Sequence, residues 1–338
     1  MDITFNLFGG TVHLWPWPPS IPFDVWIENF FDWFKETFAA FFDALSVVFE
    51  TVFNAIDWVL SYPPDWAFIL IAAIAALFAR GRKFAIGTAI ALVFIVSVGQ
   101  WENAIATLAL VLVATLAATL IAIPLGIWAA RNDRVSAFVK PLMDLLQTLP
   151  AFVYLVPALA LFGIGVAPGI LATVIFAVAP GVRLTELGIR GVDKEVIEAG
   201  QAFGATPGRI LRQIQIPLAM PSIMAGINQV IMLSLSMVVI AGMVGAPGLG
   251  DPVTEAVLTL DEGLGFEAGL SVVFLAIILD RFTASVGKGM GLYAQLAKAR
   301  KQRRETAEQA RIDAEIVEME AHSAESTIAT PAGDNSKV

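Results

Sequence analysis

The chain has 338 residues, of which 57% are hydrophobic and 15% charged, and its formal net charge is −9. Soluble domains carry about 25% charged residues, so this composition predicts an integral membrane protein, and the negative charge argues against nucleic-acid binding, which needs a basic surface. There is no cysteine, and the only histidines, His13 and His322, stand near the ends, which argues against disulfides, thiolate metal sites and histidine-based centres.

Residues 1–65 form a compositional block of their own. After a stretch rich in Trp and Pro, polar residues recur at steps of three, four or seven from Asp24 to Asp57, and aromatic and aliphatic residues fill the rest. This spacing predicts one or two amphipathic helices within about 22–60. Two placements remain open, because such helices can lie on membrane lipid at the interface or pack on the protein's own bundle. The acidic N-terminus predicts no cleavable signal peptide.

The apolar runs after residue 65 predict an all-α integral membrane protein, a polytopic helix bundle of about seven spans. About 20 apolar residues are needed to cross roughly 30 Å of hydrocarbon. The glycine-rich stretch at 163–169 divides one charge-free run into two spans, and Pro124 predicts a kink. The expected spans cover residues 66–79, 84–101, 103–130, two segments within 145–182, 218–245 and 267–287.

The basic residues predict the orientation of the bundle. With seven spans, 20 of the 21 lysines and arginines fall in one set of loops, and Lys35 alone falls in the other. The basic set is expected to be cytoplasmic, which places the N-terminus outside and the C-terminus inside. The expected organisation is an external region (1–65), two accessory spans (66–101), a core transmembrane domain (102–290) and a charged cytoplasmic tail with a disordered end (291–338).

The inner loop at 184–217 is unusually polar for this chain. Asp193 can cap a helix, and Gly200 and Gly204, four residues apart, are expected to share one helical face that lets another chain approach closely. Thr206 and Pro207 fit the start of a second helix, and Pro217 is expected to end the unit. The loop is therefore predicted to be helix, turn and helix, and an ordinary structural loop is the alternative interpretation.

These residues resemble the signature of permease subunits of bacterial ABC importers. That signature reads Glu-Ala-Ala, three residues, Gly, nine residues, Ile, one residue, Leu, Pro, and this chain departs from it only at Gly200 and Ile216. In that family the segment, here 194–217, is a coupling helix that docks on the ATP-binding subunit. The resemblance implies that contact with the ATPase involves Glu198, Ala199, Gly200, Gly204, Arg209, Ile214 and Pro217.

A closer resemblance, within residues 100–290, is to the glycine betaine/proline betaine permeases. It rests on "QTLPAFVYLVPALALFGIG", "VRLTELGIRGV", "NQVIMLSLSMVVIAGM" and "ILDRFTASVG". It implies the type I ABC importer permease fold, a homodimer in the bacterial inner membrane, and import of a small zwitterionic osmolyte delivered by an external substrate-binding protein. Choline, carnitine, a sulfonium solute or an amino acid are alternative cargoes, and a self-contained channel or secondary transporter is the alternative class.

The chain itself is not expected to be an enzyme. It lacks the G-x-x-x-x-G-K-[ST] phosphate loop, so it should hold no cofactor, and ATP and Mg should bind a separate ATPase subunit. Polar residues inside spans are candidates for the pathway or a gate, although packing and hydrogen bonding between helices are the favoured explanation for any single one. Asp144 and Glu186 are candidate partners for the charged pair in the last span. The candidates are Gln147, Thr148, Tyr154, Asn228, Ser234, Met237, Asp280 and Arg281.

Overall fold

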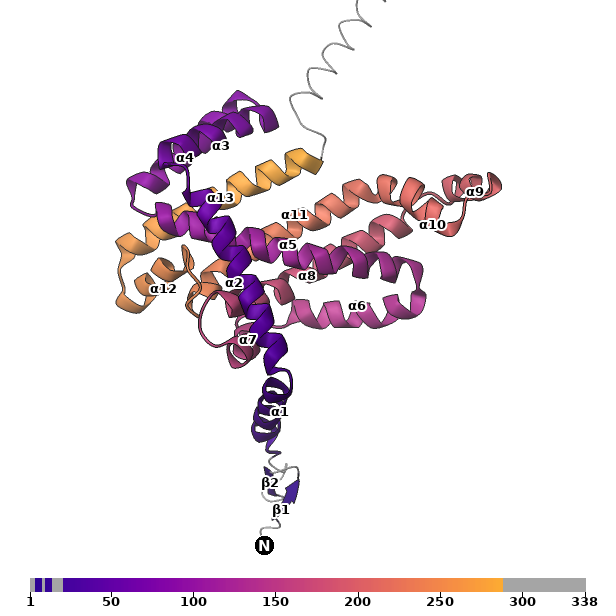
Figure 1. Ribbon diagram of the computed structural model, residues 1–338, viewed down its shortest axis with the longest axis horizontal. Helices are drawn as coiled ribbons and strands as arrows, with labels where there is room; N and C mark the ends of the chain where they lie inside the picture. The colour runs from indigo at the N-terminus through magenta and orange to yellow at the C-terminus, as the bar shows by residue number, and fades with distance from the viewer. Residues whose placement is uncertain (1–3, 8–9, 14–20, 288–338) are drawn as a thin grey trace, which may run out of the picture.

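A computed structural model describes residues 4–7, 10–13 and 21–287 of the chain (Figure 1). This part is helical apart from a small antiparallel hairpin of β1 (Thr4–Leu7) and β2 (Gly10–His13), in which Thr4 pairs with His13. The expected cytoplasmic tail lies outside the described residues. The long helices are α1 (Phe23–Thr37), α2 (Ala39–Ser61), α3 (Asp65–Arg80), α4 (Arg82–Ser97), α5 (Trp101–Arg131), α6 (Asp133–Thr148), α8 (Val166–Arg190), α11 (Ile216–Gly242) and α13 (Glu262–Gly287).

The centre of the bundle is formed by α5, α8 and α11, which pack closely because small residues line their contacts. A Cβ built on Gly181 of α8 would lie 2.8 Å from Ala122 Cβ of α5 and 3.1 Å from Val230 Cγ2 of α11. A Cβ on Gly126 of α5 would lie 2.6 Å from Thr185 Cβ of α8. Small residues let helix backbones approach in a membrane, where packing holds helices together. The all-helical membrane fold predicted from the sequence is therefore confirmed in its class.

The segment expected to hold a span before Gly163 is instead a bent pair of helices. Helix α6 ends at Thr148, and a 3₁₀ turn (Ala151–Tyr154) followed by the short α7 (Leu155–Phe162) continues at 109° to it. Leu149, which precedes Pro150, has the extended conformation that a following proline favours. The break therefore lies at Pro150, earlier in the chain than the glycine-rich stretch that separates α7 from α8.

The number of helices long and apolar enough to cross a membrane differs from the seven expected. The described residues contain five, or six if the bent pair is counted as one span. Helices α3 and α4, expected as accessory spans, have 16 residues each and form a tight hairpin at Gly81, whose φ is +91°. At 1.5 Å per residue each is about 24 Å long, which is shorter than the hydrocarbon layer of about 30 Å.

The two N-terminal helices differ in their surroundings. Phe53 of α2 is buried, and Phe49 and Ile56 pack with it against the core of α5, α8 and α11. Helix α1 has no buried residue and projects away from the bundle (Figure 1). Helix α2 is long enough to span, yet it crosses α5 and α8 at a steep angle (Figure 1), so we expect it to run along the membrane plane while packing on the bundle.

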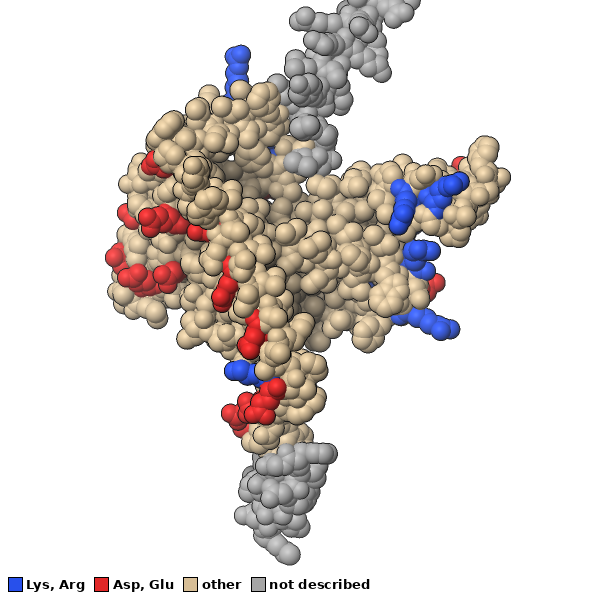
Figure 2. Space-filling model, viewed as in Figure 1, with Lys and Arg blue, Asp and Glu red and all other residues tan. Residues whose placement is uncertain are grey.

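The ends of the long helices carry opposite charges. Figure 2 shows lysines and arginines gathered where α5 meets α6 and over the loop after α8, whereas acidic side chains gather around α12 (Gly250–Thr259) and along α1 and α2. This separation runs along α5, α8 and α11, as expected if the basic end is cytoplasmic. The placement of the N-terminus outside and the C-terminus inside remains a prediction.

Candidate functional site

The inner loop is an ordered helix, turn and helix at the basic end of the bundle. Asp193 caps α9 (Lys194–Ala202), because its Oδ1 accepts a hydrogen bond from the Glu195 amide at 3.0 Å. After α9 the chain turns through Gly204, whose φ of +76° lies in the left-handed region that favours glycine. A second helix, α10 (Pro207–Ile210), then begins with Thr206 at the N-cap and Pro207 at N1, as the sequence predicts.

Gly200 and Gly204 have different roles from the one expected. They do not share a helical face, because α9 ends at Ala202 and Gly204 belongs to the turn. Gly200 points into the loop itself: a Cβ there would lie 2.7 Å from Ile214 Cδ1 and 3.7 Å from Ile210 Cγ1. Around Gly204 a Cβ would meet nothing within 4 Å. Gly200 therefore closes the loop on its own second helix, and Gly204 allows the turn.

The second half of the loop runs without a break into α11. Residues Leu211–Gln215 form one π-helical turn, and α11 begins at Ile216. Pro217 stands directly after the π-helical turn, in the first turn of α11, and the helix continues through it, so the expectation that Pro217 ends the unit is wrong. A proline has no amide hydrogen, so it donates no intrahelical hydrogen bond at this point. The helical stretch from Pro207 to Gly242 covers 36 residues. Movement of the loop is thus connected mechanically to a spanning helix.

The tip of the loop presents an apolar side chain that the sequence analysis did not select. Phe203 is 93% exposed, and Glu198, Ala199 and Arg209 are exposed near it. An aromatic side chain is seldom this exposed without a partner, and aromatic residues are enriched in the centres of protein interfaces. The available signal was an isolated Phe in a polar segment, immediately before the turn glycine.

The candidates for a pathway or gate do not come together at one place. Tyr154, Ser234 and Met237 are buried in the packed core, and Tyr154 donates a hydrogen bond to the Leu146 carbonyl. Gln147 and Thr148 are exposed at the end of α6. These three buried side chains therefore face neighbouring helices in the protomer, whereas the two on α6 lie on an open surface.

The charged pair in the last span has partners other than those expected. Asn228 Nδ2 of α11 donates to Asp280 Oδ1 of α13 at 3.2 Å, and Arg281 is exposed. Asp144 pairs with Arg183, and Glu186 is engaged by residues of α6 and α8. The expectation that Asp144 or Glu186 meets this pair is therefore wrong. Asn228–Asp280 is a polar tie between two adjacent helices.

One face of α11 is left open by the protomer. Its exposed residues follow steps of four, three, four and seven, so they share one side of the helix: Ala225, Gln229, Met232, Ser236 and Met243. No acidic or basic residue lies in this face. Near the loop it meets a hollow of about 500 Å³ lined by residues including Leu187, Gly191, Leu218 and Ser222. An amide within a span is costly against lipid, which favours protein or water next to Gln229.

No group of three or more histidine, cysteine or acidic side chains that could hold a metal ion occurs among the described residues. The candidate site consists of an exposed, ordered loop, a spanning helix continuous with it, and an open face on that helix.

Comparison with known proteins places the chain in a family. Residues 122–291 match the model of the binding-protein-dependent transport system inner membrane component. The chain belongs to this family. It is 46% identical over 268 residues to the glycine betaine transport system permease protein OpuAB of Bacillus subtilis (strain 168), which covers 79% of the chain and 95% of that relative. It is 45% identical to the glycine betaine/proline betaine transport system permease protein ProW of Escherichia coli (strain K12), covering 79% and 76%.

The fold agrees with this membership. An inward-facing structure of the MetNI methionine ABC transporter superposes with a TM-score of 0.53 at 19% identity, covering 56% of this chain and 95% of that one. A second crystal form of that transporter superposes with a TM-score of 0.51 at 20% identity, covering 54% of this chain and 92% of that one. The chain therefore has the fold of an ABC importer permease and is a multi-pass protein of the bacterial inner membrane.

Proposed function

We propose that the chain is the membrane-spanning permease subunit of an ATP-driven importer of a small zwitterionic osmolyte such as glycine betaine or proline betaine. The observation that carries the mechanism is the continuity of the loop with α11: the segment that resembles a coupling helix is ordered, exposed and joined to a spanning helix without a break. The substrate class is supported by two permeases about 45% identical over most of the chain whose names specify betaines.

The partners follow from the same site. The loop supplies one docking element for an ABC ATPase subunit that holds ATP and Mg, with Phe203 at its tip and Glu198 and Arg209 beside it. A two-fold pair of ATPases needs two such loops, so a second copy of the chain is expected. An external substrate-binding protein delivers the solute to the acidic end, and membrane lipid surrounds the bundle.

Transport then depends on two conformations of the dimer. Closure of the ATPase pair moves both loops, and because each loop is continuous with α11, the spanning helices shift between outward-open and inward-open states. The open face of α11 with Gln229, Met232 and Ser236 is the best placed surface to line the solute path, since its amide and hydroxyl groups are unsuited to lipid. Gln147 and Thr148 are the exposed candidates from α6.

Carnitine is the alternative cargo with specific support. A glycine betaine/carnitine transport permease protein, GbuB of Listeria monocytogenes serotype 1/2a (strain 10403S), is 44% identical over 274 residues. Carnitine shares a trimethylammonium group and a carboxylate with glycine betaine, so a single path can admit both. Selection between them is then left to the binding protein, where aromatic rings suit quaternary ammonium groups.

The test is uptake by a reconstituted complex. The chain is assembled in liposomes with its ATPase and its binding protein, and uptake of radiolabelled glycine betaine is followed with and without ATP. Competition with unlabelled proline betaine, carnitine, choline and a neutral amino acid ranks the cargoes. ATP-dependent uptake that betaines suppress best is the expected result. Uptake at the same rate without ATP would overturn the proposal, and strongest competition by the amino acid would overturn the substrate class.

A further inference from the structure

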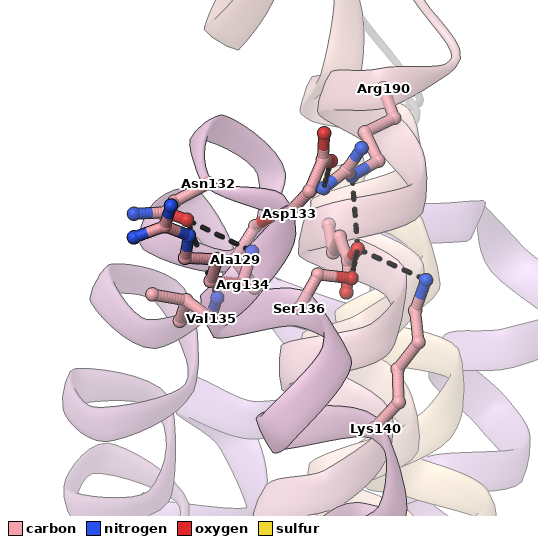
Figure 3. A network of polar contacts seen from close by, with 9 residues as sticks. Ala129, Asn132, Asp133, Arg134, Val135, Ser136, Lys140 and Arg190 are labelled. Carbon is pink, nitrogen blue, oxygen red and sulfur yellow. Dashed lines mark hydrogen bonds and ion pairs between the residues drawn. The ribbon is translucent and has the colours of Figure 1, made fainter.

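A buried carboxylate lies where the coupling loop leaves the membrane helices. Glu186, in the penultimate turn of α8, is only 4% exposed. Its Oε1 accepts a hydrogen bond from Ser136 Oγ of α6 at 2.7 Å and lies 3.3 Å from Lys140 Nζ of α6 and 3.0 Å from Arg190 Nε of its own helix (Figure 3). One carboxylate oxygen thus collects a hydroxyl and two cations from two helices.

Arg190 extends the contacts of Glu186 to a third helix. Its Nη2 donates a hydrogen bond to the Ala129 carbonyl oxygen near the end of α5 at 2.8 Å, and it lies 2.8 Å from Asp133 Oδ1 at the start of α6 as an ion pair. Figure 3 shows Arg190 reaching from α8 over the turn between α5 and α6. A guanidinium has several donors in a fixed plane, which suits it to hold a carboxylate and a carbonyl at once.

Arg190 is also the last residue of α8, and the coupling helix α9 begins at Lys194. On the other side of this turn, a Cβ on Gly188 would lie 2.7 Å from Ser222 Cβ and 3.3 Å from Ala219 Cβ of α11. The stem of the coupling loop is the last part of α8, from Glu186 to Arg190. Close packing at Gly188 holds this stem on α11, and the contacts of Glu186 and Arg190 hold it on α5 and α6.

The contacts around Glu186 differ in solvent exposure, and the exposure indicates which of them are strong enough to hold the helices together. Asp133 is 91% and Lys140 59% exposed at their side chains, so solvent screens their attraction. The Glu186 side chain is 5% exposed, and a buried carboxylate is tolerated only while its partners remain in place. Such a network favours one arrangement of the helices over others more than it adds overall stability.

We propose that Glu186, Ser136 and Arg190 are positioning residues for coupling: they clamp the inner ends of α5 and α6 to the stem of the coupling loop. Because of this clamp, α6 and its bent continuation move with the loop, so one displacement at the ATPase reaches α6 as well as α11. This inference rests on the proposed function of the loop. It assigns a role to a buried acidic group that docking alone does not use.

The test compares Glu186→Gln and Ser136→Ala with Glu186→Asp and a matched control. Asp144→Asn is the control, because it removes an ion pair with Arg183 between the same two helices, in which the Asp144 side chain is 65% exposed rather than buried. Solute taken up per ATP hydrolysed is measured in the reconstituted complex. We expect Glu186→Gln and Ser136→Ala to lower this ratio about fivefold or more while the ATPase still binds. Glu186→Asp, which keeps the carboxylate, should lower the ratio less than Glu186→Gln does, and Asp144→Asn should leave it unchanged.

A second measurement does not depend on the importer proposal. The chain lacks cysteine, so spin labels can be placed at Phe138 of α6 and Gln201 of α9, both exposed, and the distance distribution between them recorded for the purified permease. Glu186→Gln should broaden this distribution, and Asp144→Asn should not. The clamp would be overturned if Glu186→Gln changed neither the solute taken up per ATP hydrolysed nor the distance distribution between the labels. It would also be overturned if Glu186→Gln lost ATPase binding in proportion to its loss of uptake. Absence of ATP-driven uptake by the unmodified complex would instead overturn the proposed function.

Discussion

Gly200 of α9 lies directly against Ile214 of the π-helical turn, so that a Cβ on Gly200 would come within 2.7 Å of Ile214 Cδ1. Replacing Gly200 with Val should push α9 away from the second half of the loop, at a cost of about 1–3 kcal/mol, and weaken binding of the ATPase. Ile214→Ala in the same chain should recover part of the loss by making room. Affinity for the purified ATPase measures both effects.

Gly208 provides the matched control for that pair. It stands in the same loop, and a Cβ there would meet nothing within 4 Å, so Gly208→Ala should bind the ATPase as the unmodified chain does. If Gly200→Val also bound normally, the packing of the loop on itself would have no part in recognition.

Substitutions of Gly204 test whether the turn needs a left-handed backbone, because there is room for a side chain at this position. Its φ is +76° and its surroundings are open, so a side chain is opposed only by the left-handed backbone, at about 1–2 kcal/mol for an ordinary residue. Asn adopts that region more readily than a β-branched residue. In the reconstituted complex, we expect Gly204→Asn to keep the rates of ATP hydrolysis and solute uptake, and Gly204→Val to lower both rates several-fold. Equal activities would show that the turn does not need this conformation.

The helical class, the inner loop and its Asp193 and Pro207 boundaries were predictable, because capping residues and helix breakers act locally. The direction in which Gly200 faces was not, since it depends on a contact with Ile214, fourteen residues later. The break at the glycine-rich stretch was predicted and separates α7 from α8, whereas the additional bend at Pro150 was not predicted. The pairing of Asp144 with Arg183, and of Glu186 with Ser136 and Lys140, could not be read from the sequence, because these partners are 39 to 50 residues apart on different helices. The pairing of Glu186 with Arg190 could have been, since the two stand four residues apart on one helix.

Phe203 should be a main contact of the loop with the ATPase. It is 93% exposed, and truncating an aromatic anchor at the centre of an interface costs about 2 kcal/mol or more, which is about a 30-fold loss of affinity. Phe203→Ala should therefore lower ATPase affinity by about that factor without changing insertion or yield. Phe266→Ala is the control, since Phe266 is 73% exposed near the opposite end of the bundle. A similar affinity for the two variants would mean that Phe203 does not enter the interface.

The orientation of the bundle can be read from single cysteines in this cysteine-free chain. Thr259 in α12 and Gln201 in α9 are both exposed, and they lie on loops predicted to face opposite sides. A membrane-impermeant thiol reagent applied to intact cells should label Thr259→Cys and spare Gln201→Cys until the membrane is opened. Labelling of Gln201→Cys in intact cells would reverse the topology.

The hydrogen bond between Asn228 of α11 and Asp280 of α13 can have a structural role or a role in gating, and substitutions distinguish the two. Asn228 Nδ2 donates to Asp280 Oδ1 at 3.2 Å, and Asn228 Oδ1 is buried without a hydrogen-bond partner among the described residues. Asp280→Ala should leave the whole amide unpaired and cost about 1–3 kcal/mol, seen as a lower melting temperature of the purified permease. Arg281→Ala, at the exposed neighbouring position, should leave that temperature unchanged.

The double variant decides between the two roles. Replacing both partners by apolar residues, Asn228→Leu with Asp280→Leu, removes the unpaired group and can be nearly neutral for stability. If the bond only holds α11 to α13, this variant should recover both the melting temperature and solute uptake. Recovery of stability with uptake still lost would assign the pair to the gate, because the polar groups would then be needed in a second conformation rather than in this one.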